Sequence, residues 1–402
     1  MPKRVKGGIT APTGFVAAGF HSGIKKTNQL DLALIVSEKA GPIAGVFTSN
    51  TLPAAPVILD RLHLKKGIGQ ALIINSGNAN AFTGSEGYAH AKEMGRRVAD
   101  QLQIPLHHVF VGSTGVIGVP LPMQAVRKGI PKLILRLRKS GYREAAQAIM
   151  TTDTYHKEIA VQHRIAGKMV TIGGIAKGSG MIHPDMATML AYLTSDVAID
   201  QKTLQKTLCT VTNQTFNCIS VDGETSTNDT VLCLANGLAG NTPIRGSSSA
   251  QVQFKNLLQE VCHFLAMEIC RDGEGATKII KIDISGASSH KTAKQFAQTL
   301  ATSPLVKTAI FGADPNWGRI IAALGRTGLP LHSNRIVIAF NDLPIVKDGK
   351  GLGPRREEQV KKIMRRPSLT ISVSLGMGKG SSTIWTTDLT YDYIKINASY
   401  RS

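Results

Sequence analysis

The chain has 402 residues, 42% of them apolar, and its 47 lysines and arginines outweigh 27 acidic residues to give a formal net charge of +20. A chain of this length can bury a large core, and its size suggests two or three domains. Its aromatic content of 5% and its lack of any apolar run near the ~18 residues of a spanning helix exclude a membrane-spanning protein. The basic N-terminal segment has no apolar stretch after it, which predicts a cytoplasmic protein without a secretory signal.

Strands dominate the first predicted elements. Short apolar runs separated by turn residues predict strands over residues 30–36, 43–47 and 71–75. Residues 85–103 predict a helix with Ser85 as its N-cap. A short strand over residues 109–111 should follow and end in a turn at Ser113-Thr114-Gly115.

Strands and helices then alternate to the end of the chain. Apolar periodicity predicts buried strands over 169–175 and 189–193, and helices over 203–213, 250–270 and 291–300. Beyond residue 281 the pattern restarts with strand-like runs at 282–285, 336–340, 369–375 and 384–389. We therefore expect an α/β protein with a larger domain over residues 1–281 and a smaller C-terminal α/β domain over residues 282–402.

Two dense basic segments, residues 132–139 and 355–366, could bind phosphate groups or attract anionic metabolites. Neither is interleaved with aromatic residues that could stack on bases, so solvated helix faces are the preferred interpretation. A basic nucleic-acid-binding protein stays the non-enzyme alternative, and its signature would be salt-dependent retention on DNA.

All five cysteines lie between residues 209 and 270, and none forms a CxxC pair. An odd count with this spacing argues against a disulfide framework and against a zinc ribbon. Cys262 and Cys270 fall on the apolar stripe of a predicted helix, which favours small buried residues of the core. We expect no cysteine nucleophile and no metal site.

The most unusual segment runs from Lys177 to the predicted strand that Thr188 opens. Its glycines permit positive φ angles and Pro184 fixes its own φ, so the backbone before Thr188 is a candidate for strain. A phosphate loop is disfavoured because Lys177 precedes Gly178, contrary to the order GxxxxGK[ST]. Judged from local physics alone, a plain connection between strands is an equal alternative.

This segment resembles the self-cleavage motif of the ornithine acetyltransferase family, the bifunctional glutamate N-acetyltransferase/amino-acid acetyltransferases of arginine biosynthesis. The resemblance covers nearly the whole chain and rests on nine further segments. They are GITAPTGF (8–15), INSGNANA (74–81), STGVIG (113–118), MTTDT (150–154), SVDGETSTND (220–229), DGEGATK (272–278), DPNWGR (314–319), WTTDLT (385–390) and YIKINASYRS (393–402). The chain departs from the family where Phe82, Gly112 and Thr387 replace common cysteines and where His156 replaces a usual proline, and none of these changes removes a residue that the family's chemistry uses.

The resemblance implies self-cleavage between Ala187 and Thr188, which gives an α chain of residues 1–187 and a β chain of residues 188–402. The Thr188 hydroxyl would attack the carbonyl of Ala187, and water would then release a new N-terminus from the resulting ester. The freed α-amino group, with an ordinary pKa of roughly 7.7–8.0, could serve as the general base for the hydroxyl of the same residue.

The site residues are also implied by the resemblance. The family's oxyanion hole corresponds to Thr114 and Gly115. Its substrate contacts correspond to Thr151, Lys177, Thr188, Glu274, Asn397 and Ser402. Lys177 suits an α-carboxylate and Glu274 suits the side-chain ammonium of ornithine. Without the family pattern, an ordinary turn at residues 113–115 and surface placement of each polar residue would be preferred.

The implied enzyme is a glutamate N-acetyltransferase. By a ping-pong mechanism it would move the acetyl group of N2-acetyl-L-ornithine through acetyl-Thr188 to L-glutamate. No metal and no organic cofactor are implied, and use of acetyl-CoA as a second donor stays open. The implied fold is an αββα sandwich that resembles the N-terminal nucleophile hydrolases with different connectivity, and the implied assembly is an α2β2 heterotetramer. A self-processing N-terminal-threonine aminopeptidase, which would pass its acyl group to water, is the alternative enzyme.

The end of the chain belongs to the predicted site, although Asn397 and Ser402 lie more than 200 residues beyond Thr188. Termini ordinarily fray. We expect the strand from Trp385 to Leu389 and the rings of Tyr391 and Tyr393 to anchor the tail through buried ring area, so that the carboxylate of Ser402 is held in place.

Overall fold

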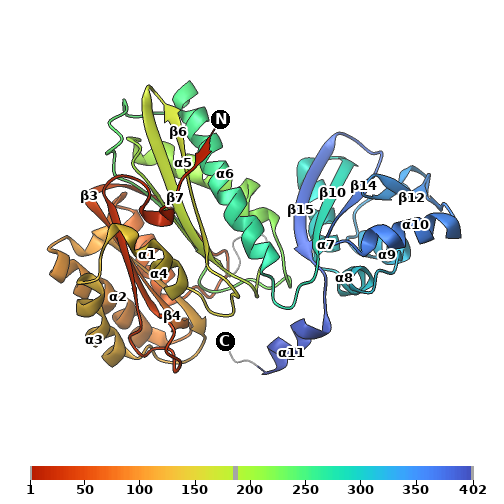
Figure 1. Cartoon of the computed structure of the whole chain (residues 1–402). Coiled ribbons are helices and arrows are strands. Elements are labelled where there is room, and N and C mark those ends of the chain that lie inside the picture. The colour runs from red at the N-terminus through yellow and green to blue at the C-terminus, as the bar shows by residue number, and fades with distance from the viewer. Residues whose placement is uncertain (1, 184–188, 400–402) are drawn as a thin grey trace.

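The computed structural model describes residues 2–183 and 189–399, which form two β-sheets with their helices (Figure 1). The first sheet has the strand order β1-β6-β7-β8-β9-β3-β4-β5, and β2 pairs with β3. Its strands are β1 (Lys3–Arg4), β2 (Phe15–Phe20), β3 (Leu32–Phe47), β4 (Ile68–Asn78), β5 (Val109–Val116), β6 (Lys157–Ile165), β7 (Lys168–Lys177), β8 (Leu190–Ser195) and β9 (Thr230–Ala235).

Strand β3 joins the two halves of this sheet. Its residues 32–36 pair with β2 and β4, whereas residues 43–47 pair with β9. The pairing with β4 shifts register between Val36 and Gly41. The two strands predicted over residues 30–36 and 43–47 are therefore one bent strand that belongs to both halves.

The two halves pack face to face, with one hydrophobic core between them. Alternate residues of each strand point into this core or into an outer core under the helices. Leu72 and Ile74 of β4 share one core with Leu190 and Tyr192 of β8. Residues between these positions face outward onto helices, since side chains alternate along a strand. Helices α5 (Gln201–Gln214) and α6 (Ser249–Arg271) cover the half with β6 to β9, and α1 (Ala55–Leu64), α2 (Gly84–Leu102) and α3 (Met123–Ile134) cover the half with β2 to β5. This confirms the predicted αββα sandwich.

The short helix α4 (Tyr142–Ala148) contributes alanines to the core between the sheets and contacts β2. Short 3-10 helices lie at η1 (Gly8–Thr10), η2 (Leu106–His108), η3 (Lys139–Gly141), η4 (Phe216–Cys218) and η5 (Ser333–Arg335).

Two local predictions are wrong. Helix α2 begins at Gly84 with Thr83 as its N-cap, so Ser85 lies inside the helix. Strand β5 does not end before Ser113 but continues through Val116, because β4 runs parallel to it as far as Asn78. The predicted turn at 113–115 is thus the end of a paired strand.

The second sheet has the strand order β13-β12-β11-β14-β10-β15. Its strands are β10 (Ile279–Ala287), β11 (Val337–Phe340), β12 (Leu343–Lys347), β13 (Lys350–Gly351), β14 (Ser368–Ser374) and β15 (Gly380–Thr387), and its helices are α7 (His290–Ala301), α8 (Pro304–Phe311), α9 (Trp317–Gly325) and α10 (Pro354–Met364). These elements share a core whose buried residues run from Ile280 to Ile384. We propose that the smaller domain begins with β10, three residues before the boundary expected at residue 282.

Within β15, Trp385 bridges to Ile219, the residue that follows η4. After β15, helix α11 (Tyr391–Ser399) lies below and between the two sheets (Figure 1). In the described part of the chain, no helix has both the length and the apolarity needed to cross a bilayer.

Candidate active site

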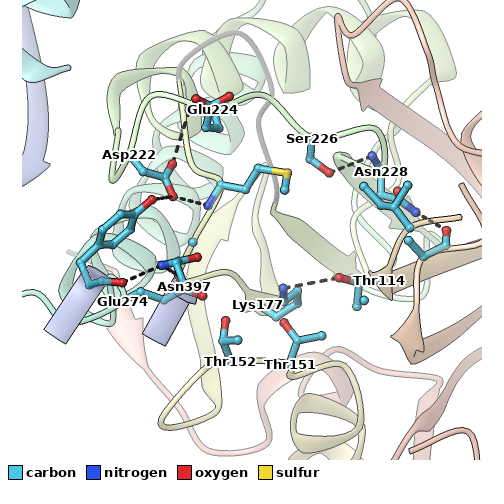
Figure 2. Close-up of a pocket in the computed structure, with 16 residues that line it drawn as sticks. Thr114, Thr151, Thr152, Lys177, Asp222, Glu224, Ser226, Asn228, Glu274 and Asn397 are labelled. Carbon is cyan, nitrogen blue, oxygen red and sulfur yellow. Dashed lines mark hydrogen bonds between the residues drawn. The ribbon is translucent and has the colours of Figure 1, made fainter. Parts of the chain in front are cut away.

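A cavity of about 150 Å³ lies where the ends of β5 and β7 meet helix α11. Six of the predicted site residues line it, although their positions in the sequence range from 114 to 397. They are Thr114, Gly115, Thr151, Lys177, Glu274 and Asn397. Figure 2 shows Glu274 and Asn397 on one side and Thr114 on the other, with Lys177 between them. The predicted residues Ala187, Thr188 and Ser402 lie outside the described residues.

The end of β5 requires glycine at position 115. Gly115 has a φ of 132°, and a Cβ built on it would stand 2.4 Å from the carbonyl carbon of Gly77. Only glycine tolerates both the backbone angle and the close approach of β4. The side-chain amide of Asn228 fixes this end by donating to the carbonyls of Ser113 (2.8 Å) and Ala79 (2.7 Å). These contacts hold the backbone of residues 114 and 115 and the Thr114 hydroxyl at the wall of the cavity.

Lys177 is the last residue of β7, and its side chain is 4% exposed. Its Nζ lies 3.5 Å from Oγ1 of Thr114 and 3.9 Å from Oδ2 of Asp153. Burial lowers the pKa of Lys177, and the carboxylates of Asp153 and Glu274 act in the opposite direction. A buried ammonium in a cavity is suited to binding a carboxylate.

Glu274 enters the cavity from the turn after α6. Its N–H donates to the carbonyl of Ser179 (2.9 Å), and its carboxylate lies against Gly180, where a Cβ would stand 2.4 Å from Oε2. Nδ2 of Asn397 donates to the same Oε2 (2.9 Å). The cavity is therefore lined by the ammonium of Lys177 and by the carboxyl groups of Asp222, Glu224 and Glu274, which come from distant parts of the chain.

The structure adds Asp222 and Tyr393, which the sequence analysis did not assign to the site. Asp222 accepts hydrogen bonds from the N–H groups of Met181 (2.6 Å) and Ile182 (2.8 Å), and the Tyr393 hydroxyl lies 3.3 Å from its Oδ2. Burial raises the pKa of Asp222. Both residues lie in segments quoted for the family resemblance, and that was the only sequence signal for them.

Beyond residues 184–188 the described chain resumes beside Lys177. The N–H of Met189 donates to Oδ1 of Asp229 (2.9 Å), and its carbonyl accepts from the N–H of Thr230 (3.1 Å). Leu190 then pairs with Lys177 at the start of β8. Asp229 is fully buried, which raises its pKa well above the ordinary value.

The tail is held differently from our expectation. Tyr391 is 80% exposed and only touches Phe311 edge-on, so the predicted burial of its ring is wrong. Hydrogen bonds hold the tail instead, because Oγ1 of Thr390 donates to the carbonyl of Gly275 (2.6 Å) and Asn397 reaches Glu274. The physical reason is that α11 crosses the mouth of a polar cavity and faces no apolar core.

Other candidate groups lie away from the cavity. Cys262 and Cys270 are buried in the core along α6, as predicted, and burial raises the pKa of Cys270 to about 12. Among residues 2–183 and 189–399, no cluster of histidine, cysteine and acidic residues could hold a metal ion.

Comparisons with known proteins relate the whole chain to one family. A model of the ArgJ family matches residues 16–402. The arginine biosynthesis bifunctional protein ArgJ of Caldanaerobacter subterraneus subsp. tengcongensis is 46% identical over 400 residues, which cover 98% of this chain and 99% of that protein. The protein of the same name from Lactococcus lactis subsp. lactis is 45% identical over 406 residues and is matched along its full length.

Solved structures are also similar. A crystal structure of the arginine biosynthesis bifunctional protein ArgJ from Bacillus halodurans is 43% identical with a TM-score of 0.49, and covers 52% of this chain and 97% of its own. Ornithine acetyltransferase from Mycobacterium tuberculosis, complexed with ornithine, is 38% identical with a TM-score of 0.42, and covers 46% of this chain and 98% of its own.

Proposed function

The chain belongs to the ArgJ family, and on this premise we propose that it transfers the acetyl group of N2-acetyl-L-ornithine to L-glutamate, giving L-ornithine and N-acetyl-L-glutamate. The observation that carries the proposal is the single cavity in which Lys177 and Glu274 stand with Thr114 and Gly115. It combines the Lys177 ammonium, the Glu274 carboxylate and two groups able to donate to an oxyanion.

The charges of the cavity match those of the proposed donor. N2-acetylornithine has no free α-ammonium, so it carries one carboxylate and one side-chain ammonium. Lys177 would bind the carboxylate and Glu274 the ammonium, with Asn397 orienting Glu274 through its 2.9 Å hydrogen bond. Glutamate would use the same lysine for its α-carboxylate.

Acyl transfer needs a nucleophile, and we assign this role to Thr188 after self-cleavage between Ala187 and Thr188. Both residues lie outside the described part of the chain, so the support is indirect. The next residue, Met189, is fixed at Asp229 and Thr230 where β8 begins, and β8 pairs with Lys177. The cut would therefore fall one residue from a backbone position held beside the cavity.

In the proposed mechanism the freed α-amino group of Thr188 removes the proton of its own hydroxyl, and the hydroxyl oxygen attacks the acetyl carbon. The oxyanion that forms would accept hydrogen bonds from the Thr114 hydroxyl and the Gly115 N–H. Removal of one such donor typically lowers kcat by about 10²–10³. The ammonium of Thr188 returns the hydroxyl proton to the α-nitrogen of ornithine as the amide C–N bond breaks, and ornithine leaves. The free amine of glutamate then attacks the carbonyl of acetyl-Thr188, the ester C–O bond breaks, and the proton lost by the amine restores the Thr188 hydroxyl.

We further propose that the cleavage products assemble as an α2β2 heterotetramer in the cytoplasm, that the reaction uses no cofactor, and that acetyl-CoA is a second acetyl donor. The family resemblance supports the first two statements. The third is supported by the relatives, which are named bifunctional proteins of arginine biosynthesis.

The experiment that tests the proposal separates cleavage from chemistry. The purified protein is mixed with acetyl-labelled N2-acetylornithine, quenched rapidly, and run on a denaturing gel with N-terminal sequencing. We expect two chains, the smaller beginning at Met1 and the larger at Thr188, with label on Thr188 before glutamate is added. Thr188→Ala is the control, which should stay one unlabelled chain.

Two outcomes would contradict the proposal. An active enzyme that consists of one intact chain would end the assignment of Thr188. Release of acetate instead of acetylglutamate, with glutamate present, would favour the aminopeptidase-like alternative.

A further inference from the structure

Behind Lys177 lies a buried ionic network that does not line the cavity. Lys157 Nζ contacts Oδ1 of Asp153 (2.7 Å) and Oδ2 of Asp272 (2.6 Å), and all three side chains are at most 2% exposed. We propose that Asp153 is a positioning residue of the active site, whose negative charge keeps Lys177 in its ammonium form and in place to bind the substrate carboxylate. This inference rests on the proposed function and adds a residue to it.

Both oxygens of Asp153 are occupied by groups from the site. Oδ1 also accepts the N–H of Gly178 (2.7 Å), and Oδ2 accepts the N–H of Thr151 (3.0 Å) and lies 3.9 Å from Nζ of Lys177. One carboxylate thus ties the end of β7 to the loop that carries Thr151. If Asp153 served only as the ion-pair partner of Lys157, its carboxylate would not also need to accept the N–H groups of Gly178 and Thr151.

The network also reaches the segment that carries Glu274. Asp272, on the far side of Lys157, accepts the N–H of Thr154 at 3.0 Å through Oδ2. Glu274 follows Asp272 by two residues. The chain from Asp153 through Lys157 to Asp272 therefore fixes the two segments that carry Lys177 and Glu274 relative to each other.

The charge of Lys177 depends on its neighbours, because burial alone favours the neutral amine. Asp153 is ionised in this setting. Burial by itself would raise its pKa, but Lys177, Lys157 and the N–H of Gly178 lower it to about 2. The charged and titratable groups that act on Lys177 are Asp153, Glu274 and Asp229, which favour the ammonium, and Lys157 and Lys25, which oppose it.

Among these groups Asp153 supplies the dominant fixed negative charge. Asp229 has its own pKa raised by burial, which weakens its contribution. Glu274 is committed in the proposed reaction to the substrate ammonium. Lys25, whose Nζ donates to the Met150 carbonyl (2.7 Å), adds positive charge at the same loop, and burial lowers its pKa to about 8.

The test is the pH profile of kcat/KM for N2-acetylornithine in Asp153→Asn. Without the charge, the pKa of Lys177 falls, so the ammonium is lost at lower pH and carboxylate binding is lost with it. We expect the alkaline limb to move down by at least about one pH unit, which is roughly a tenfold loss of kcat/KM at the old limb. The loss should appear in KM, and activity should recover at lower pH.

A second variant guards against a folding defect in Asp153→Asn, whose NH₂ would face the donors Lys157 Nζ and the N–H of Gly178. Asp153→Glu keeps the carboxylate, so it should keep the alkaline limb close to its wild-type pH. Asp283→Asn is the matched control: it removes the acid of an ion pair with Lys281 (2.8 Å) in the second sheet and should leave the profile unchanged.

The outcomes separate the inference from the proposed function. Equal loss of kcat/KM at every pH in both variants would overturn the inference and leave a structural role. A wild-type protein that transfers no acetyl group from N2-acetylornithine would overturn the proposed function itself.

Discussion

Tyr192 is fully buried between the two layers of the sandwich, and its hydroxyl has no hydrogen-bond partner within residues 2–183 and 189–399. The hydroxyl points at Gly112 of β5, where a Cβ would stand only 2.0 Å from its oxygen. The same Cβ would be 3.2 Å from Cζ of the ring and from Cγ1 of Ile74. The glycine at position 112 is therefore matched to a tyrosine across the core.

The contact between Gly112 and Tyr192 predicts that substitutions at the two positions have non-additive effects on the free energy of unfolding. Gly112→Ala should destabilise the protein by about 1–3 kcal/mol, because the added methyl group collides with the Tyr192 hydroxyl. Tyr192→Phe should be neutral or stabilising, since it removes a buried hydroxyl without a described partner. The double variant should lose less than Gly112→Ala alone. Thermal melts of all four proteins measure the coupling, and simple addition of the two effects would refute the contact.

The residues that we propose to touch substrate were named from the sequence, whereas the residues that support them were not. Lys177 and Glu274 stand in motifs whose letters identify the family. Asp153 also lies in such a motif, MTTDT, but its role depends on Lys157 and Asp272, the latter 119 residues away. A single sequence contains no record of which aspartate meets which lysine, so the ionic network emerges only from the fold.

At the scale of elements, the local pattern of apolar residues predicted the positions of most helices and strands. It did not predict the ends of strands that are set by pairing with another strand. Helix α6 was expected over residues 250–270 and spans Ser249–Arg271, because its apolar stripe repeats over many turns. Strand β5 extends past the predicted turn because β4 continues beside it. Extension of that kind depends on a partner strand about 40 residues earlier, which no local window contains.

Helix α11 has no buried residue in its described span Tyr391–Ser399, and it is held by hydrogen bonds and by the edge-on contact of Tyr391 with Phe311. Deleting residues 397–402 should therefore leave the fold and the cut before Thr188 intact. It should lower kcat/KM for N2-acetylornithine roughly 10- to 100-fold, the range for losing a hydrogen bond to a charged group such as Glu274. Ile394→Ser, at a 61% exposed position of the same helix, is the control for perturbing α11 itself. Unchanged kcat/KM after the deletion would show that the tail takes no part in substrate binding.

At the scale of the molecule, the proposed cut divides elements that belong to the same layers. Strand β7 precedes residue 188 and β8 follows it, yet the two pair antiparallel from Ile172–Ser195 to Lys177–Leu190. Strands β3 and β9 likewise pair across the division. The outer helices α5 and α6 come from the later part of the chain and pack on strands from the earlier part, α5 on β3 and α6 on β6 and β7.

From this interleaving we predict that the two chains stay together after cleavage. Separating them would unpair β7 from β8 and β3 from β9, and would expose a shared core in which each buried Leu, Ile or Val contributes about 1.5–3 kcal/mol. The cleaved protein should therefore elute from a native sizing column at the volume of uncleaved Thr188→Ala and with the same far-ultraviolet circular dichroism, and only denaturant should resolve residues 1–187 from 188–402. If the two chains separate in native buffer, either the cut lies elsewhere or the strand order described here is wrong. Because the sheet is continuous across the cut, hydrolysis would free an amino group for catalysis without releasing either half of the site.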